Sequence, residues 1–146
     1  MVSRVNDSRR LANDLRPVLL RLARRLRRES HAFGITGGQA TILASIKDQP
    51  GVTARELAQR EHVSAPRMSA ELAVLEAAGL VRGERGLDRR RVALFLEPEG
   101  KRVLQAVRRQ RTAWLAERLE QLTDADRRAI AQAAEPLQRL LGADAS

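Results

Sequence analysis

The chain contains no cysteine. Disulfides, thiolate zinc sites, iron–sulfur clusters and cysteine-based redox switches are therefore excluded. Long hydrophobic runs are missing as well, since no apolar stretch approaches the roughly 18 residues of a membrane span. The segment from Met1 to Arg10 has no apolar core of the kind that a signal peptide needs. These absences lead us to expect a cytoplasmic protein.

Residues suited to catalysis are also scarce. His31 and His62 are the only histidines, and no spacing of His, Asp and Glu indicates a metal site or a catalytic triad. We interpret His31 as a helix-end residue and His62 as a turn residue between two helices. The segment GITGG matches no nucleotide-binding fingerprint. We therefore expect neither an enzyme nor a bound metal or cofactor.

Aromatic residues make up only 2% of the chain, whereas apolar residues as a group make up 43%. A length of 146 residues is typical of one domain and is sufficient for a sizeable core. We expect a single folded chain whose core consists mostly of Leu, Ala, Val and Ile.

Positive charge predominates. The chain has 27 Lys and Arg against 18 Asp and Glu, which gives a formal net charge of +9. An excess of this size favours an acidic polymer as the partner. Nearly all of the cations are arginines, whose planar guanidinium suits phosphates and guanine edges. A high-GC coding bias would produce the same preference for arginine, so the composition leaves both explanations open.

A long amphipathic helix is predicted in the N-terminal part of the chain. Its apolar positions recur every three or four residues, at Leu11, Leu15, Leu19, Leu22 and Leu26. Pro17 lies inside this pattern, so we expect either a kink or a helix that becomes regular only after Pro17. We interpret the arginine-rich segment RLARRLRR as a solvated helix face in preference to a DNA contact.

Three shorter helices are predicted from their caps. Thr36 and Gln39 have the spacing of a capping box, and that helix ends at the segment QPG, residues 49–51. Thr53 and Glu56 repeat the spacing at the start of a second helix. The predicted inner faces are Ile42, Leu43 and Ile46 in the first helix, Leu57 and Ala58 in the second, and Met68, Leu72 and Leu75 in the third.

The third helix begins at Ser64 as its N-cap, with Pro66 tolerated in the first turn, and ends at Gly79. It follows the second helix after a tight connection. Two short capped helices in this arrangement are typical of a helix-turn-helix, in which the first helix braces and the second enters a DNA groove.

A β-hairpin is predicted next, in the segment RGERGLDRRRVALFLEPEG, residues 82–100. Its loop from Arg82 to Arg91 holds five arginines against Glu84 and Asp88, a net charge of +3. Such a loop suits the narrow, electronegative minor groove of DNA. A merely soluble hairpin does not need this concentration of one sign, so we favour DNA contact.

The rest of the chain is predicted to be helical. Pro98 suits a first helical turn, and Thr123 caps a last helix that Pro136 should bend. The apolar stripes are Val103, Leu104, Val107, Trp114, Leu115 and Leu119, followed by Ile130, Ala134, Leu137 and Leu141. A winged module does not need these helices for its own core, so we interpret them as a dimerisation apparatus. The predicted fold is mainly α with a small β-hairpin wing, a winged helix-turn-helix flanked by N- and C-terminal dimerisation helices.

With these parts in this order, the chain resembles the MarR-type (multiple antibiotic resistance regulator) winged-helix transcription factors. The resemblance covers nearly the whole chain and rests on ELAQREHVSAPRMSAELAVLEAAGLV followed closely by DRRRVALFLEPEG. The family pattern of aspartate, any residue and arginine in the wing, then a strand and a glycine, matches Asp88, Arg90, residues 92–96 and Gly100.

The resemblance implies one MarR-like chain over residues 1–146. It places the DNA-binding lobe at about residues 36–97 and the dimerisation helices at about residues 8–31 and 98–142. It also implies a homodimer on a pseudo-palindromic operator in double-stranded DNA, released by a small aromatic or phenolic effector. No residue identifies the effector site, and we interpret Trp114 as a packing residue in preference to a ligand contact.

The resemblance implies roles for particular side chains. Arg90 matches the wing-tip arginine that enters the minor groove, and Asp88 matches the acid that orients the wing through an internal ion pair, with Arg82 as its candidate partner. The predicted DNA contacts are Ser64, Ala65, Arg67 and Ser69 on the recognition helix and Arg85, Arg89, Arg90 and Arg91 on the wing, of which Arg89 and Arg91 are expected at phosphates.

Two positions depart from the family pattern. Many members have an arginine just after the position of Ser69, whereas Ala70 and Glu71 follow here, so base readout is expected to weaken or to move to Arg67. Glu97 stands where a threonine usually caps the next helix.

We therefore expect a sequence-specific transcriptional regulator that acts as a repressor. The alternative is a winged-helix module that binds nucleic acid without sequence preference, or binds protein, and has no ligand control. Duplex binding measured against salt and sequence separates the two.

Overall fold

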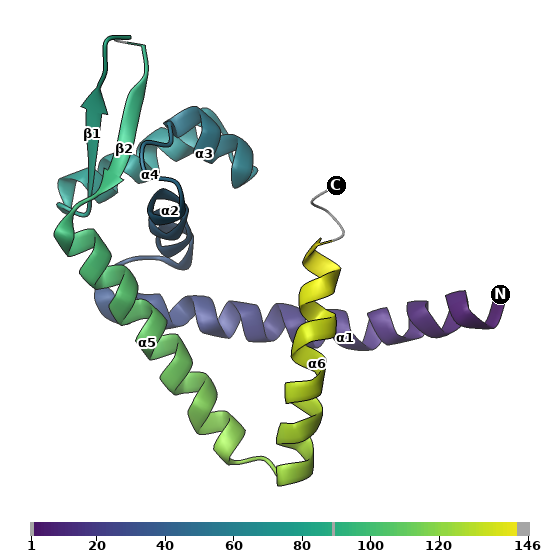
Figure 1. Cartoon of the computed structure of the whole chain (residues 1–146). Coiled ribbons are helices and arrows are strands. Elements are labelled where there is room, and N and C mark those ends of the chain that lie inside the picture. The colour runs from purple at the N-terminus through teal and green to yellow at the C-terminus, as the bar shows by residue number, and fades with distance from the viewer. Residues whose placement is uncertain (1, 89, 143–146) are drawn as a thin grey trace. The chain divides into compact units, whose positions relative to one another are not determined.

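The structure is a computed structural model that describes residues 2–88 and 90–142. Its elements, in chain order, are α1 (Val2–Arg28), the 3-10 helix η1 (Glu29–Phe33), α2 (Gly37–Asp48), α3 (Ala54–Arg60), α4 (Ala65–Ala77), β1 (Val81–Arg85), β2 (Val92–Leu96), α5 (Pro98–Glu120) and α6 (Asp124–Gly142) (Figure 1). The mainly helical fold with a small hairpin is confirmed. The chain forms two compact units, Met1–Arg111 and Thr112–Ser146.

The short helices of the first unit begin at the predicted caps. Thr36 Oγ1 accepts a hydrogen bond from Gln39 N (3.1 Å), and Gln39 Oε1 accepts one from Thr36 N (3.0 Å), so the capping box is complete. The hydroxyls of Thr53 and Ser64 accept from the backbone N–H three residues further along the chain. These bonds satisfy amide donors that the start of a helix leaves without an intrahelical partner.

Backbone conformation explains how α3, α4 and the hairpin are joined. His62 lies in the turn between α3 and α4, as predicted, and has a left-handed φ of 53°. Gly79 follows the end of α4 with a φ of 74°, which is a conformation that glycine adopts at little cost. Helix α4 and the hairpin are therefore separated by one short turn.

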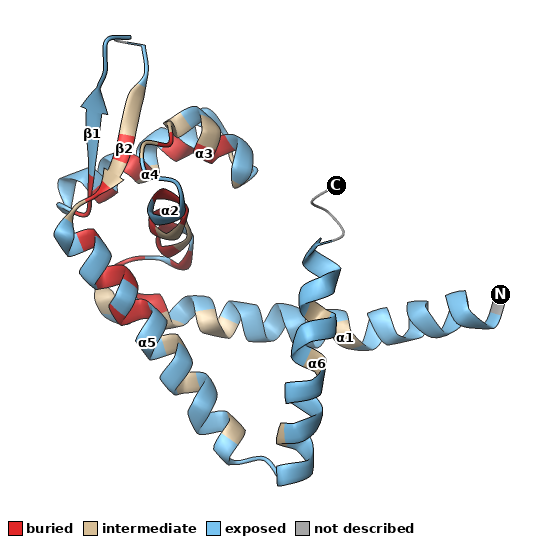
Figure 2. Ribbon diagram, in the orientation of Figure 1, coloured by how far each residue is buried: buried red, intermediate tan, exposed pale blue. Residues whose placement is uncertain are grey.

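An aliphatic core fills the space between α2, α3, α4, the base of the hairpin and the first half of α5 (Figure 2). Every residue predicted for the inner faces of the three short helices is buried: Ile42, Leu43, Ile46, Leu57, Ala58, Met68, Leu72 and Leu75. Val103, Leu104 and Val107 of α5 complete this core. The expectation that the winged module does not need the flanking helices for its own core is therefore wrong for the first half of α5. Within the described residues none of the aromatic side chains is fully buried, which agrees with the aliphatic core expected from composition.

The wing is an antiparallel hairpin that is held at its base. β1 and β2 pair from Val81 opposite Leu96 to Arg85 opposite Val92. Val81, Leu94 and Leu96 are buried, whereas the rest of β1 is exposed. A bridge between Val52 and Leu94 ties the base of the hairpin to the segment before α3. The far end therefore projects from a fixed root.

Gly100 allows the first turn of α5 to pack against the root of the wing. Glu97 N donates a hydrogen bond to Leu80 O (2.9 Å). A Cβ atom at position 100 would lie 2.1 Å from that same carbonyl oxygen, far inside contact distance. Only glycine fits this position without a backbone shift.

Helix α1 begins earlier than predicted and continues through Pro17. The alternative of a helix that becomes regular only after Pro17 is therefore wrong. Pro17 removes one backbone donor from the helix, but the residue is exposed, so water can bond the carbonyl that loses its partner.

The end of α1 is fixed to α5 by polar contacts. Arg111 Nε donates to Leu26 O (3.0 Å), and Gln110 Nε2 donates to Glu29 Oε2 (3.1 Å). Burial, together with the nearby positive charge of Arg27, lowers the pKa of Arg111. The Arg111 guanidinium is stabilised at this partly buried position because it donates to Leu26 O, a carbonyl near the negative end of α1.

The second unit contains the end of α5 and α6. Thr123 Oγ1 accepts from Asp126 N (3.1 Å), which confirms the predicted cap. The Arg127 guanidinium donates to Leu119 O at the end of α5 (3.2 Å) and to Leu122 O in the turn that follows (2.6 Å). Pro136 lies inside α6 without ending it, and none of the described residues of α6 is buried.

Candidate nucleic-acid interface

The exposed face of α4 carries the predicted recognition residues. Met68, Leu72 and Leu75 fix the opposite face in the core. With that face buried, the helical period turns the remaining side chains of the first turns to solvent. The exposed residues include Ser64, Ala65, Arg67 and Ser69. The structure thus groups all four residues, of which Ser64 is the N-cap, at one accessible helix end.

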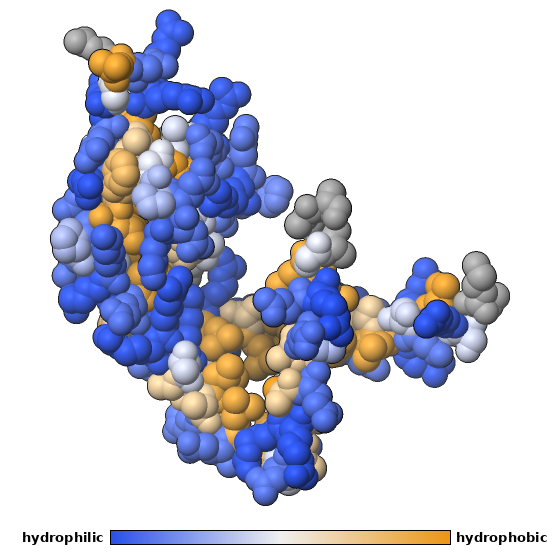
Figure 3. All heavy atoms as spheres, in the orientation of Figure 1, coloured by the Kyte–Doolittle hydropathy of each residue, from blue (hydrophilic) through white to orange (hydrophobic). Residues whose placement is uncertain are grey.

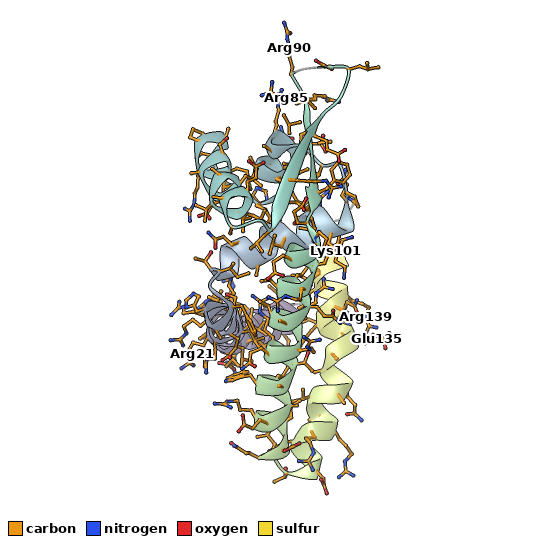
Figure 4. All side chains as sticks on the ribbon, turned by 90° about the vertical axis from the view of Figure 1, so that its left-hand side faces the viewer. Arg21, Arg85, Arg90, Lys101, Glu135 and Arg139 are labelled. Atoms are coloured by element: carbon orange, nitrogen blue, oxygen red, sulfur yellow. The ribbon has the colours of Figure 1, made fainter. Side chains whose placement is uncertain are left out.

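The tip of the wing is shaped by Asp88. Its Oδ1 accepts a hydrogen bond from Arg90 N (3.1 Å), and its carbonyl accepts one from Arg91 N (3.1 Å). Both bonds stabilise a tight turn of the kind that aspartate favours. Arg90 extends beyond the end of the hairpin, and Arg85 lies nearer to the base (Figure 4). Arg85, Arg90 and Arg91 are exposed; Arg89 lies outside the described residues.

Arg82 fixes the root of the wing and not its tip. Its guanidinium pairs with Glu84 (3.1 Å) and with Glu97 (3.4 Å), and it also donates to Leu96 O (3.3 Å). It lies over the Phe95 ring, with 5.0 Å between Cζ and the ring centroid. The bond to Glu84, followed by that to Glu97, raises the pKa of Arg82.

The ion pair expected between Asp88 and Arg82 is therefore replaced by two separate sets of contacts. The strand register explains this correction, because Arg82 lies opposite Phe95 near the base whereas Asp88 lies in the turn beyond Arg85. Asp88 forms its contacts at the tip of the wing and Arg82 forms its contacts at the root. The Glu97 carboxylate, which stands where a threonine usually caps the next helix, forms part of the contact at the root of the wing.

An open groove of about 730 Å³ separates α3 from the wing. Arg90 and Arg91 line it from the wing, and Arg55 lines it from the exposed side of α3. The sequence reasoning did not single out Arg55. The sequence signal that could have identified Arg55 is its position in the first turn of α3, two residues after the N-cap Thr53. The side chain is exposed there. The groove therefore adds a third guanidinium to the basic surface of the lobe.

Two buried polar side chains of α2 fix the helix-turn-helix to the rest of the lobe. Gln39 Nε2 donates to Glu71 Oε2 of α4 (2.9 Å), and Ser45 Oγ donates to Glu61 Oε1 at the end of α3 (2.9 Å). Gln39 was predicted only as a capping residue. Its second bond depends on the packing of α2 against α4, which the local pattern does not contain.

The described residues provide neither a metal site nor a membrane-spanning helix. Across residues 2–88 and 90–142, no cluster of three or more His, Asp or Glu is placed to hold a metal ion. The described helices include none with the length and hydropathy of a membrane span. The surfaces with the most distinctive chemistry are the arginine-bearing wing and the exposed start of α4.

The chain is similar to known proteins over most of its length. A family model described as MarR family matches residues 33–91. A helix-turn-helix-type transcriptional regulator of Mycobacterium bovis is 33% identical over 132 residues, which cover 90% of this chain and 92% of that protein.

Solved structures extend the likeness to the flanking helices. A transcriptional regulator from Pseudomonas aeruginosa is similar with a TM-score of 0.78 and 33% identity, over 94% of this chain and 96% of that one. A mutant of MarR from Escherichia coli has the same fold, with a TM-score of 0.77 and 22% identity, over 90% of this chain and 96% of that one.

Proposed function

This chain belongs to the MarR family of DNA-binding transcriptional regulators, and we propose that it is a homodimeric repressor of a pseudo-palindromic operator. The observation that carries the proposal is the pairing, on one lobe, of an exposed recognition-helix start with a rigidly rooted wing that ends in arginines. A helix of this kind fits the major groove, and an arginine-tipped wing fits the adjacent minor groove.

In this proposal the two surfaces have different tasks. Arg67 and Ser69 contact base edges, while Ser64 and Ala65 bring the start of α4 close to the phosphate backbone. Arg90 enters the minor groove, and Arg85, Arg89 and Arg91 contact phosphates beside it. Arg55 joins them from α3, because it lines the same groove as Arg90 and Arg91.

Exposed apolar side chains support the dimer. Among the described side chains of α1, six large apolar ones are exposed: Val5, Leu11, Val18, Leu19, Leu20 and Leu22. Ile130, Leu140 and Leu141 of α6 are exposed too, and apolar residues remain visible on the surface outside the winged lobe (Figure 3). A second copy would remove such surface from water. We assign residues 8–31 and 98–142 to this interface.

Effector release is the remaining part of the proposal. A dimer sets the distance between two recognition helices, so a ligand that prefers one dimer geometry shifts the population that fits DNA. We propose a small aromatic or phenolic anion in this role. Trp114 is a poor candidate for its contact, because the Arg118 guanidinium already lies over the ring, 4.4 Å from its centroid.

Selection from a random duplex pool, followed by footprinting, tests the proposal. We expect enrichment of a pseudo-palindrome with half-sites about 34 Å apart, which is about one helical turn. The protein mass, measured by light scattering, should be twice that of one chain. Steep salt dependence without any enriched sequence would favour the non-specific winged-helix module instead.

A further inference from the structure

Gln39 of α2 serves two helices with one side chain. It is 8% exposed. Its Oε1 accepts from Thr36 N and closes the cap of α2, while its Nε2 donates to Glu71 Oε2 of α4 at 2.9 Å. The acceptor and one donor of the amide are therefore both used, which fixes the orientation of its two ends.

Glu71 lies one helical turn after Arg67 on the recognition helix. Side chains four residues apart are neighbours on a helix surface and readily form an ion pair. Arg67 and Glu71 also line the same cavity of about 130 Å³, together with Arg27 and Glu61. The two side chains are thus within reach of each other across a common space.

The ion pair is nevertheless not formed. In the described part of the chain, no ion pair or side-chain hydrogen bond involves the Arg67 guanidinium. The Glu71 carboxylate is bonded to Gln39, and the other carboxylate at the cavity, that of Glu61, accepts from Ser45. Polar side chains of α2 therefore occupy both acids that line the cavity with Arg67.

We propose that the Gln39 amide holds the Glu71 carboxylate so that it does not pair with Arg67, and thereby keeps Arg67 free to contact DNA. This inference rests on the proposed function, since it takes Arg67 to be a DNA contact. Gln39 is then a positioning residue that acts through Glu71 without touching DNA. It also explains how the recognition helix can carry a carboxylate one turn after Arg67.

Gln39→Glu is the informative change. Glutamate has the same length and also completes a capping box, so the start of α2 is retained. It has no donor for Glu71 and repels that carboxylate, which then becomes available to Arg67. We expect duplex affinity to fall about tenfold and the salt slope to fall by about one, as for the loss of one arginine contact.

Gln49→Glu controls for the added negative charge. Gln49 is exposed at the end of α2, outside the residues assigned to the dimer interface, and its Oε1 accepts from Arg60, a bond that a carboxylate keeps. We expect it to change affinity by less than about twofold, because an exposed charge is screened by salt. Equal losses for Gln39→Glu and Gln49→Glu would refute the proposal.

The double variant Gln39→Glu/Glu71→Ala separates positioning from simple structural support. It has the net charge of the wild type and still lacks the bond between α2 and α4, but the Glu71 carboxylate one turn after Arg67 is removed. The carboxylate at position 39 caps α2, and that of Glu61 accepts from Ser45. We expect affinity and salt slope to return to within about twofold of wild type. A folded double variant that binds as weakly as Gln39→Glu would mean that Gln39 acts only by bracing α4, which contradicts the proposal.

The contact is also tested without DNA. In ¹⁵N-labelled protein, Glu71→Ala should shift the side-chain amide signals of Gln39 and accelerate their exchange with water. Unchanged signals would overturn the proposal whatever the binding data show. Binding is measured on the selected duplex, or on a random duplex of equal length if selection yields no sequence, in which case the operator proposal fails and the salt slopes still test Gln39.

Discussion

Single side chains of the wing differ in whether they shape it or remain available to a partner. Asp88 and Arg82 use their polar atoms within the chain, at the tip and at the root respectively. Arg90 differs, because its backbone N–H bonds to Asp88 while its guanidinium projects outward. Replacing Arg82 should therefore loosen the wing, whereas replacing Arg90 should affect DNA binding alone.

Arg90→Ala should therefore weaken operator binding by about 1–3 kcal/mol, the usual contribution of an arginine in a groove. Its thermal midpoint should stay within about 2 °C of wild type, since no internal side-chain contact is lost. Fluorescence anisotropy and calorimetry measure the two quantities. Arg4→Ala, on the exposed start of α1 and outside the residues assigned to the interface, is the matched control. A comparable loss of thermal stability in Arg90→Ala would mean that Arg90 is structural.

Gly100→Ala should destabilise the lobe by more than about 2 kcal/mol, because the new methyl group meets the backbone oxygen of Leu80 and not a flexible side chain. Gly38→Ala is the matched control, since the nearest atom to its Cβ would be Thr36 Oγ1 at 3.9 Å. That change should be neutral or stabilising by up to about 1 kcal/mol. Urea denaturation measures both, and similar midpoints would contradict the tight packing of α5 on the wing root.

The secondary structure elements were largely predictable because their signals are local. Hydroxyl caps, the spacing of apolar residues and the glycine after α4 each act within a few residues, so α2, α3, α4 and their buried faces follow from the sequence. The arginine density between Arg82 and Arg91 likewise marked the exposed hairpin. The start of α1 was predicted too late, because the apolar positions were counted only from Leu11. Pro17 was also expected to disturb the helix more than it does where the helix is solvated.

Contacts between elements could not be predicted in the same way. The bond between Gln39 and Glu71 joins residues 32 positions apart, and the pairing of Arg82 with Glu97 depends on strand register. Position 100 requires glycine because a Cβ atom there would clash with Leu80 O, and this clash depends on the path of the backbone at Leu80. Each feature arises from packing, so the sequence indicated which side chains are polar or small but not which partners they meet.

The wing should be less rigid in Arg82→Met. Methionine can still lie against Phe95, but the bonds to Glu84, Glu97 and Leu96 O are lost. Because Arg82 is about half exposed and its ion pairs are screened by solvent, the free energy of unfolding should change little. Amide hydrogen exchange in the hairpin should nevertheless accelerate, and DNA affinity should fall severalfold.

Arg102→Met provides the comparison for the wing, since it removes an exposed pair with Glu99 on α5 that does not involve the hairpin. Its hairpin amides should exchange as in wild type. Equal exchange in both variants would show that the Arg82 contacts do not set the mobility of the wing.

The whole molecule has two kinds of surface that a single copy leaves unexplained. One is the positive surface of the winged lobe, which suits DNA in either a monomer or a dimer. The other is the exposed apolar side of α1 and α6, which gains nothing from DNA and is costly in water. If a second copy covers the apolar surface, charge placed there should separate the copies and leave the lobe folded.

Leu140→Glu is the corresponding test, because this leucine of α6 is 63% exposed in one chain. Burying an unpaired carboxylate in a dimer interface is costly, so the variant should sediment as a monomer and lose cooperative operator binding. Leu87→Glu adds the same charge at the wing tip, where the leucine is fully exposed, and should sediment as a dimer with weaker DNA binding. A dimeric Leu140→Glu with normal operator affinity would place the interface elsewhere, since a carboxylate is not tolerated at the centre of an apolar contact.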